Sequence, residues 1–223
     1  MTNSSLVRKT LRMAGAGSAL LATTLLIPQG AFAQACIGNP AMTGQFALGG
    51  MLLTADGMTG YGVEARTNPG GPLALGASIA TLDIDGADDN VFQASASGAW
   101  DLGSASFSAC PAIGVEYTQF PSDMLGFDAS MIGVPLGFAA GIQAGSGNIQ
   151  FLPSAEAGLL WQRMSFSGSA GGVTISETET DTDFYFRGGA TAVTGRFYGR
   201  AQLERIFEDN AENLFRFSVG VLF

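Results

Sequence analysis

The sequence predicts an all-β fold, a closed antiparallel up-and-down barrel of about ten strands. Apolar residues recur at every second position in successive segments, which is typical of strands with one oily face. Long polar connections alternate with tight turns between these segments. The chain holds 32 glycines and 16 phenylalanines, and its apolar residues show no helical spacing. A soluble sandwich would bury the oily face between two sheets, whereas a membrane barrel turns it outward to lipid.

Ten segments with this alternation lie between residues 45 and 223. An up-and-down barrel with both chain ends on one side needs an even number of strands, and ten satisfies this condition. Eight or twelve strands are the alternatives if one hairpin is divided differently. The segments are Gln45–Thr54, Tyr61–Thr67, Leu73–Leu82, Val91–Leu102, Ser104–Thr118, Ser130–Ala144, Asn148–Phe166, Asp183–Thr194, Arg196–Phe207 and Leu214–Phe223.

The connections between these segments differ in length. The long ones follow the third, fifth, seventh and ninth segments and read DIDGADDN, QFPSDMLGFD, SGSAGGVTISETETDTD and EDNAEN. The tight ones, DLGS, AGSGN and TGR, follow the fourth, sixth and eighth. This asymmetry is typical of a barrel that crosses the outer membrane with both ends in the periplasm. Within the longest connection, the alternating stretch TISETETDTD also predicts strand that continues above the membrane.

Aromatic residues mark the two ends of the predicted lipid-facing rows. Between them lie mostly Ala, Gly, Val and Leu, although Phe138 and Phe217 sit nearer the middle. Two aromatic girdles around an apolar band are typical of outer-membrane barrels, and a sandwich core has no reason to sort aromatics by height. The outer level holds Tyr61, Phe92, Tyr117, Trp161, Phe184 and Phe215, and the inner level holds Phe46, Trp100, Phe107, Phe151, Phe197 and Phe223.

The opposite rows of the same segments carry the charges. A charge that faces hydrocarbon costs about 2–4 kcal/mol near the midplane, whereas opposite charges in a lumen can pair. Only Arg163 and Arg205 depart from this rule, and both sit near the outer ends of strands. The sequence therefore predicts a lumen charge network of Glu64, Arg66, Glu116, Glu156, Arg187, Arg196, Arg200, Glu204 and Arg216.

Residues 1–33 have the layout of a secretory signal peptide. Basic Arg8, Lys9 and Arg12 precede an apolar run, and small residues around Ala33 form a cleavage site. A buried N-terminal helix or a lipoprotein anchored at Cys36 are the alternatives, although Ala33 stands where a lipobox normally has leucine. Residues 34–44 would then form a periplasmic or plug segment, and residues 45–223 the outer-membrane barrel.

Charge excludes one class of partner. Removal of residues 1–33 takes away three of the ten basic residues and none of the 19 acidic ones, which leaves a net charge of −12. No lysine and no histidine remain. Because nucleic-acid phosphates demand basic residues, no nucleic-acid partner is expected.

With its leader and its ten alternating segments, the chain resembles the small outer-membrane β-barrel family, which includes OmpX-like and opacity-like proteins. The most specific motif is the closing stretch LFRFSVGVLF. In that family the final aromatic residue and the alternating apolar residues before it direct insertion by the barrel-assembly machinery. The resemblance assigns this signal to Phe215, Phe217, Val219, Val221 and Phe223, and it implies outer-membrane lipid and lipopolysaccharide as partners.

Cys36 and Cys110 are the only cysteines, and an exported protein meets an oxidising compartment. Cys110 lies on the polar row of its segment, and Cys36 just precedes the first strand. We expect a disulfide between them that holds residues 34–44 inside or against the periplasmic mouth. Two free, buried thiols are the alternative.

The residues that could support catalysis or metal binding are few. Without histidine, neither a Ser–His pair nor a histidine-based metal site can form, and no phosphate-binding glycine motif occurs. Glu116 and Glu156 could in principle serve as acid and base, but structural pairing with arginines is the expected role. No enzyme activity and no cofactor are therefore expected. Weak divalent-cation binding is conceivable at the acidic loop that holds Asp83, Asp85, Asp88 and Asp89.

Two functions remain in view. The first is a structural or surface-interaction barrel whose lumen is largely filled by side chains and whose extracellular ligand is unknown. The second is a narrow channel for small solutes. Interiors of about eight strands are filled, and open aqueous channels belong to barrels of about 16 strands or more, which favours the first.

Overall fold

The computed structural model describes residues 35–41, 44–86, 89–103, 107–121, 128–145, 149–170, 173–208 and 213–223. The side chains of residues 169–175 are outside this description, and so is the predicted signal peptide. The export prediction therefore stays a prediction. Among the described residues, no helix is both long enough and apolar enough to cross a membrane.

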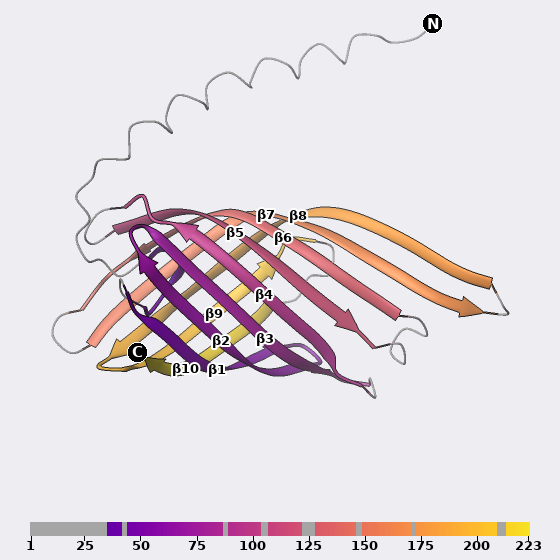
Figure 1. Cartoon of the computed structure of the whole chain (residues 1–223), viewed down its shortest axis with the longest axis horizontal. Helices are drawn as coiled ribbons and strands as arrows, with labels where there is room; N and C mark the ends of the chain where they lie inside the picture. Colours follow the sequence, from indigo (N-terminus) through magenta and orange to yellow (C-terminus); the bar gives the residue numbers. More distant parts are fainter. Residues whose placement is uncertain are drawn as a thin grey trace, which may run out of the picture. The chain divides into compact units, whose positions relative to one another are not determined.

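The fold is a closed antiparallel barrel of ten strands, as the sequence predicts (Figure 1). Each strand pairs with its neighbours in the chain, and β1 pairs with β10 to close the ring. The strands are β1 (Phe46–Ala55), β2 (Met58–Gly70), β3 (Leu73–Ile84), β4 (Val91–Trp100), β5 (Phe107–Phe120), β6 (Asp128–Ile142), β7 (Ile149–Ala170), β8 (Val173–Thr194), β9 (Phe197–Ile206) and β10 (Asn213–Leu222).

The closing seam joins the first and last strands over most of their length. Ala47 lies opposite Leu222, and Thr54 lies opposite Phe215. Beyond the last pair, the Phe223 N–H donates to the Phe46 carbonyl at 2.8 Å. Over these paired residues neither strand presents an open edge at the seam.

The β7–β8 hairpin is longer than the sequence segments predict. The predicted loop between Phe166 and Asp183 is almost entirely strand, because pairing continues to Ala170 opposite Val173. Alternation of threonine with acidic residues supports this extension, as anticipated for TISETETDTD. Figure 1 shows that the hairpin extends beyond the other strands. Among the described residues, β8 from Val173 to Asp183 pairs with β7 alone.

The two faces of the wall differ as predicted. Every strand exposes at least one large apolar side chain on the outside, and the exposed fraction reaches 64% at Tyr61 and 71% at Phe223. On the inside, Glu64 is only 2% exposed and Arg200 is 8% exposed. The alternation of period two therefore separates an oily exterior from a charged interior.

Candidate functional site in the barrel interior

The first group of interior charges centres on Arg187 of β8. Its Nη2 donates to Glu116 Oε1 at 2.5 Å and to Glu204 Oε1 at 2.7 Å. Arg216 Nη2 lies 3.9 Å from the other oxygen of Glu204. Four strands contribute to this Arg187 cluster, defined as Arg187, Glu116, Glu204 and Arg216. One guanidinium thus bridges a carboxylate on the adjacent strand β9 and a second one on β5.

The second group centres on Glu64 of β2. Its Oε2 accepts hydrogen bonds from Nε and Nη2 of Arg66, both at 3.1 Å. Its Oε1 accepts one from the Tyr198 hydroxyl at 3.1 Å, and Arg200 Nη1 lies 3.8 Å from Oε2. Burial of a carboxylate is costly unless it is paired and hydrogen-bonded, and Glu64 meets both conditions. This Glu64 cluster consists of Glu64, Arg66, Arg200 and Tyr198.

Two interior tyrosines accompany these clusters, and sequence reasoning missed both. Tyr198 bonds to Glu64, and the Tyr185 hydroxyl donates to Glu156. Glycines two strands away along the wall make room for the phenol rings, because a Cβ at Gly49 or at Gly137 would collide with the hydroxyl of Tyr198 or Tyr185, respectively. The available signal was their position on the polar rows of β8 and β9.

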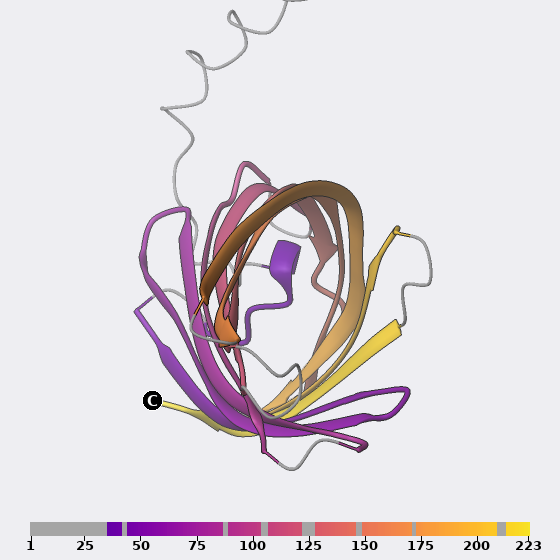
Figure 2. The same cartoon turned by 90° about the vertical axis from the view of Figure 1, so that its right-hand side faces the viewer.

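A short segment before β1 lies within the ring of strands (Figure 2). Its 3₁₀ turn, η1 (Ala35–Ile37), packs on β5, β6 and β7. Thr191 Oγ1 donates to the Gly38 carbonyl at 2.7 Å, and Arg200 Nη2 donates to the Ile37 carbonyl at 3.2 Å. These contacts fall at the barrel end that carries the short turns and the end of β10.

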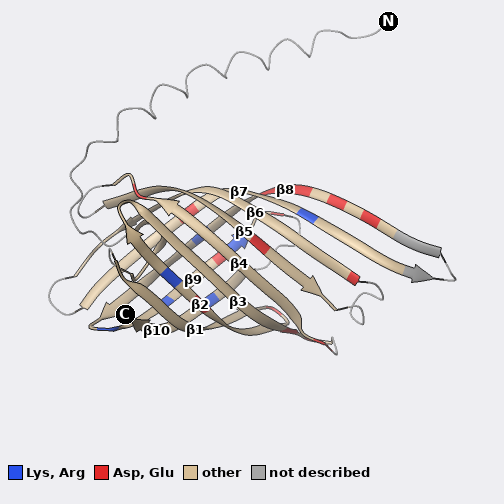
Figure 3. Cartoon of the chain, in the orientation of Figure 1, with Lys and Arg blue, Asp and Glu red and all other residues tan. Residues whose placement is uncertain are grey.

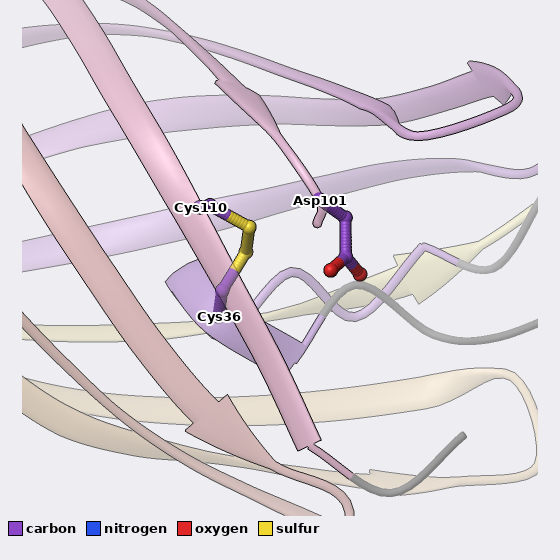
Figure 4. A group of neighbouring side chains, drawn as sticks. All are labelled: Cys36, Asp101 and Cys110. Carbon is purple, nitrogen blue, oxygen red and sulfur yellow. A yellow bond between two sulfur atoms is a disulfide. The ribbon is translucent and has the colours of Figure 1, made fainter. Parts of the chain in front are cut away.

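A disulfide joins this segment to the wall, as predicted. Cys36 and Cys110 are bonded, with their Cα atoms 6.0 Å apart. Figure 4 shows Asp101 beside the bridge. Its carboxylate accepts hydrogen bonds from the Gly103 N–H at 2.8 Å and from the Ser108 hydroxyl at 2.9 Å. Because metal binding needs thiolates, this trio is no metal site while the bridge is intact.

A small cavity of about 60 Å³ lies in the described part of the interior. Ile37 of the inserted segment borders it, and Ser78, Ser95 and Ser97 of β3 and β4 form one wall. The charged lining residues come from both clusters and from β7, and they are Arg66, Arg187, Arg200, Arg216, Glu116 and Glu156.

One member of the predicted charge network lies elsewhere. Arg196 is exposed in the two-residue turn between β8 and β9, so it is not part of either cluster. The preceding Gly195 has a φ of 57°, a left-handed conformation that suits a tight turn. The strand boundary thus moves Arg196 from the predicted lumen row to the surface.

The two other predicted groups, the acidic loop after β3 and the assembly signal at the end of the chain, lie in different parts of the barrel. Asp83 and Asp85 are exposed at the end of β3, and Asp88 lies outside the described residues. No group of metal-ligating side chains found among the described residues contains these aspartates. Of the predicted assembly signal, Phe215, Phe217 and Val219 on β10 and the following Phe223 are exposed, and Val221 is partly buried.

Figure 3 shows where charges gather outside the interior: acidic residues follow one another along the extended part of β8. Glu177, Glu179 and Asp181 are exposed there. They belong to the same alternating row of β8 as Tyr185 and Arg187, which follow later in the strand. Across the hairpin they lie opposite Phe166, Met164 and Gln162, respectively.

No family model matches the sequence, and no curated protein matches it either. Among solved structures, the chain is similar to the outer membrane protease OmpT from Escherichia coli, with a TM-score of 0.46 and 8% identity over 80% of this chain and 94% of that chain. It is also similar to Ail, the attachment invasion locus protein of Yersinia pestis, with a TM-score of 0.42 and 12% identity over 80% and 95% of the two chains.

A third similar structure is the N-terminal β-barrel domain of Pseudomonas aeruginosa OprF. The TM-score is 0.36, with 11% identity over 81% of this chain and 98% of that chain. All three are small outer-membrane β-barrels, the class that the sequence resembles. These likenesses concern the fold alone, and nothing about the activity of this chain follows from them.

Proposed function

We propose that this protein is an integral outer-membrane barrel with a structural or surface-interaction role. The observation that carries the proposal is the sorting of side chains across the wall. Large apolar residues are exposed on the outside of all ten strands, while Glu64 and the other paired charges lie inside. Because soluble monomers rarely expose such large contiguous apolar surfaces, lipid is the medium that fits this exterior.

A largely filled lumen is supported by three features of the interior. Charged side chains form ion pairs within it, residues 35–41 lie within it, and the cavity that the arginines border has a volume of about 60 Å³. The cavity with its serine wall is the observation that keeps a narrow channel for small solutes as the second candidate. No catalytic role is proposed for Glu116 or Glu156, because their hydrogen-bonded partners are an arginine and a tyrosine.

The surface-interaction role is assigned to the extended β7–β8 hairpin. Among the described residues, no strand pairs with the outer edge of β8 from Val173 to Asp183, and Glu177, Glu179 and Asp181 form an exposed acidic row there. Acidic residues discourage edge-to-edge aggregation and favour a basic partner. The identity of the ligand stays open.

Location and assembly follow from the same proposal. Residues 1–33 direct export, and the apolar row of β10 that ends at Phe223 serves the barrel-assembly machinery during insertion. Outer-membrane lipid and lipopolysaccharide then surround the apolar band.

The test begins with the location of the full-length protein after expression in a Gram-negative host. We expect it in the outer-membrane fraction, with gel mobility that changes on boiling. Recovery as freely soluble periplasmic protein would overturn the proposal. Planar-bilayer recordings then separate the two candidates, because the filled barrel is silent and the channel gives reproducible single-channel steps.

A further inference from the structure

The lining of the interior cavity is richer in cations than in anions. Four guanidinium groups border it, but only the carboxylates of Glu116 and Glu156 do. The remaining two acidic residues of the clusters, Glu64 and Glu204, are not part of the lining. Glu64 is held by Arg66 and Tyr198, and Glu204 is held by Arg187. The interior as a whole is balanced, yet this cavity is electropositive.

Three of the lining arginines also keep unused donors. Arg187 Nε, Arg200 Nη1 and Arg216 Nε are buried, and none has a hydrogen-bond partner in the part of the chain that the structure describes. Arg200 and Arg216 reach their carboxylates only at 3.8 Å and 3.9 Å, which is longer than a hydrogen bond. Each buried donor left without a partner costs about 1–3 kcal/mol.

Serine hydroxyls of β3 and β4 supply further hydrogen-bond donors to the cavity. The Ser78 and Ser95 hydroxyls lie 2.7 Å apart, so one donates to the other and the second proton is free to bind a guest. Ser97 borders the same space. A cavity of about 60 Å³ holds a few waters, at roughly 10–15 Å³ for each, or one small anion with less water.

We propose that this cavity binds one small anion, a halide or a short carboxylate, between Arg200, Arg216 and the serine wall. The anion completes the hydrogen bonding of the guanidinium groups and balances the local charge. Ile37 of the inserted segment borders the cavity, so the site is built jointly by the barrel and the disulfide-linked segment. The proposal is independent of whether the barrel conducts or binds a surface partner.

The test measures the melting of the folded full-length barrel in zwitterionic detergent. Sodium chloride and sodium acetate are titrated against sodium gluconate at constant ionic strength, because gluconate exceeds the size of the cavity. We expect the melting temperature to rise with the logarithm of the anion concentration above the Kd, by about 5–10 °C at about 100 times the Kd.

Matched variants locate the site. Arg200→Gln and Arg216→Gln each remove one lining cation, while Glu64 keeps Arg66 and Glu204 keeps Arg187. Both variants should therefore fold, which unboiled gel mobility verifies, and both should lose most of the anion-dependent shift. Arg196→Gln is the control, since Arg196 is exposed in a turn and its variant should keep the full shift.

Two results would overturn the proposal. One is a wild-type melting temperature that is the same in chloride, acetate and gluconate, which would mean that water alone fills the cavity. The other is a shift that Arg196→Gln reduces as much as Arg200→Gln does, which would mean that the salts act on surface charge.

Discussion

The Glu64 cluster and the Arg187 cluster occupy the same interior, but the first has a carboxylate at its centre and the second a guanidinium. In the first, one carboxylate faces two guanidinium groups; in the second, one guanidinium bridges two carboxylates. Their surroundings differ as well, because Arg200 of the first cluster also holds the inserted segment at Ile37. Charge neutrality is thus a property of the whole lumen, and each cluster depends on the group at its centre.

The largest effect is expected when the centre of the Arg187 cluster is removed. Arg187→Met leaves Glu116 and Glu204 without their short ion pairs inside the barrel. Loss of one partner of a buried charge pair costs about 3–5 kcal/mol of the free energy of unfolding. Glu64→Gln should cost less, because glutamine can still accept a hydrogen bond from Tyr198.

Urea unfolding in detergent measures both variants, with Arg163→Met as a control at an exposed position that should stay within about 0.5 kcal/mol of wild type. An equal loss of the free energy of unfolding in Arg187→Met and Glu64→Gln would contradict the expected difference between the two clusters.

The second effect concerns the link between the inserted segment and the wall. Paired Cys36→Ser and Cys110→Ser substitutions open a bridge between residues 74 apart in the chain. We expect a loss of about 2–4 kcal/mol in the free energy of unfolding. Because Thr191 and Arg200 still hold the segment by hydrogen bonds, the barrel should stay closed to ions in planar bilayers.

A bilayer recording of the double variant beside wild type checks this point. Channel steps that appear only after loss of the bridge would show that the bridge alone keeps the segment in the lumen. They would also favour a channel gated by that segment.

The third comparison separates the two interior tyrosines. Tyr185 provides the one side-chain hydrogen bond recorded to Glu156 within the described residues, whereas Tyr198 shares Glu64 with Arg66. Tyr185→Phe should therefore cost about 1.5–3 kcal/mol, and Tyr198→Phe about 0.5–1.5 kcal/mol. Thermal unfolding of the two variants in one detergent tests the order. A larger loss for Tyr198→Phe would show that Arg66 does not support Glu64 when the hydroxyl is gone.

Much of the wall could be predicted from the sequence, because a strand with one lipid-facing side must alternate at every second residue. This constraint located the ten strands, the inward charges and the outward Phe223. The alternation does not predict which interior side chains pair with one another when they are far apart in the sequence. Arg187 and Glu116 are 71 residues apart, and only the barrel register brings them together.

Two kinds of local error have physical causes. Arg196 has the parity of an inward residue, but a left-handed Gly195 ends β8 before it and places it in a turn. The segment boundaries end at Phe166 and begin again at Asp183 because no apolar alternation continues between them, although the alternation in TISETETDTD predicts the extra strand. In water above a membrane, pairing opposite Phe166 and Met164 still satisfies the backbone.

The smallest effect is expected at the acidic loop after β3. Asp83 and Asp85 are exposed, so each carboxylate is already solvated, unlike the buried and paired Glu64. A Ca²⁺ site needs six to eight converging oxygens, and the described aspartates do not form such a group. Titration of the purified barrel with Ca²⁺ should therefore leave its melting temperature unchanged. A rise that Asp83→Asn and Asp85→Asn abolish would instead show that the loop closes around the ion, and the exposed carboxylates would then be ligands rather than solvated surface charges.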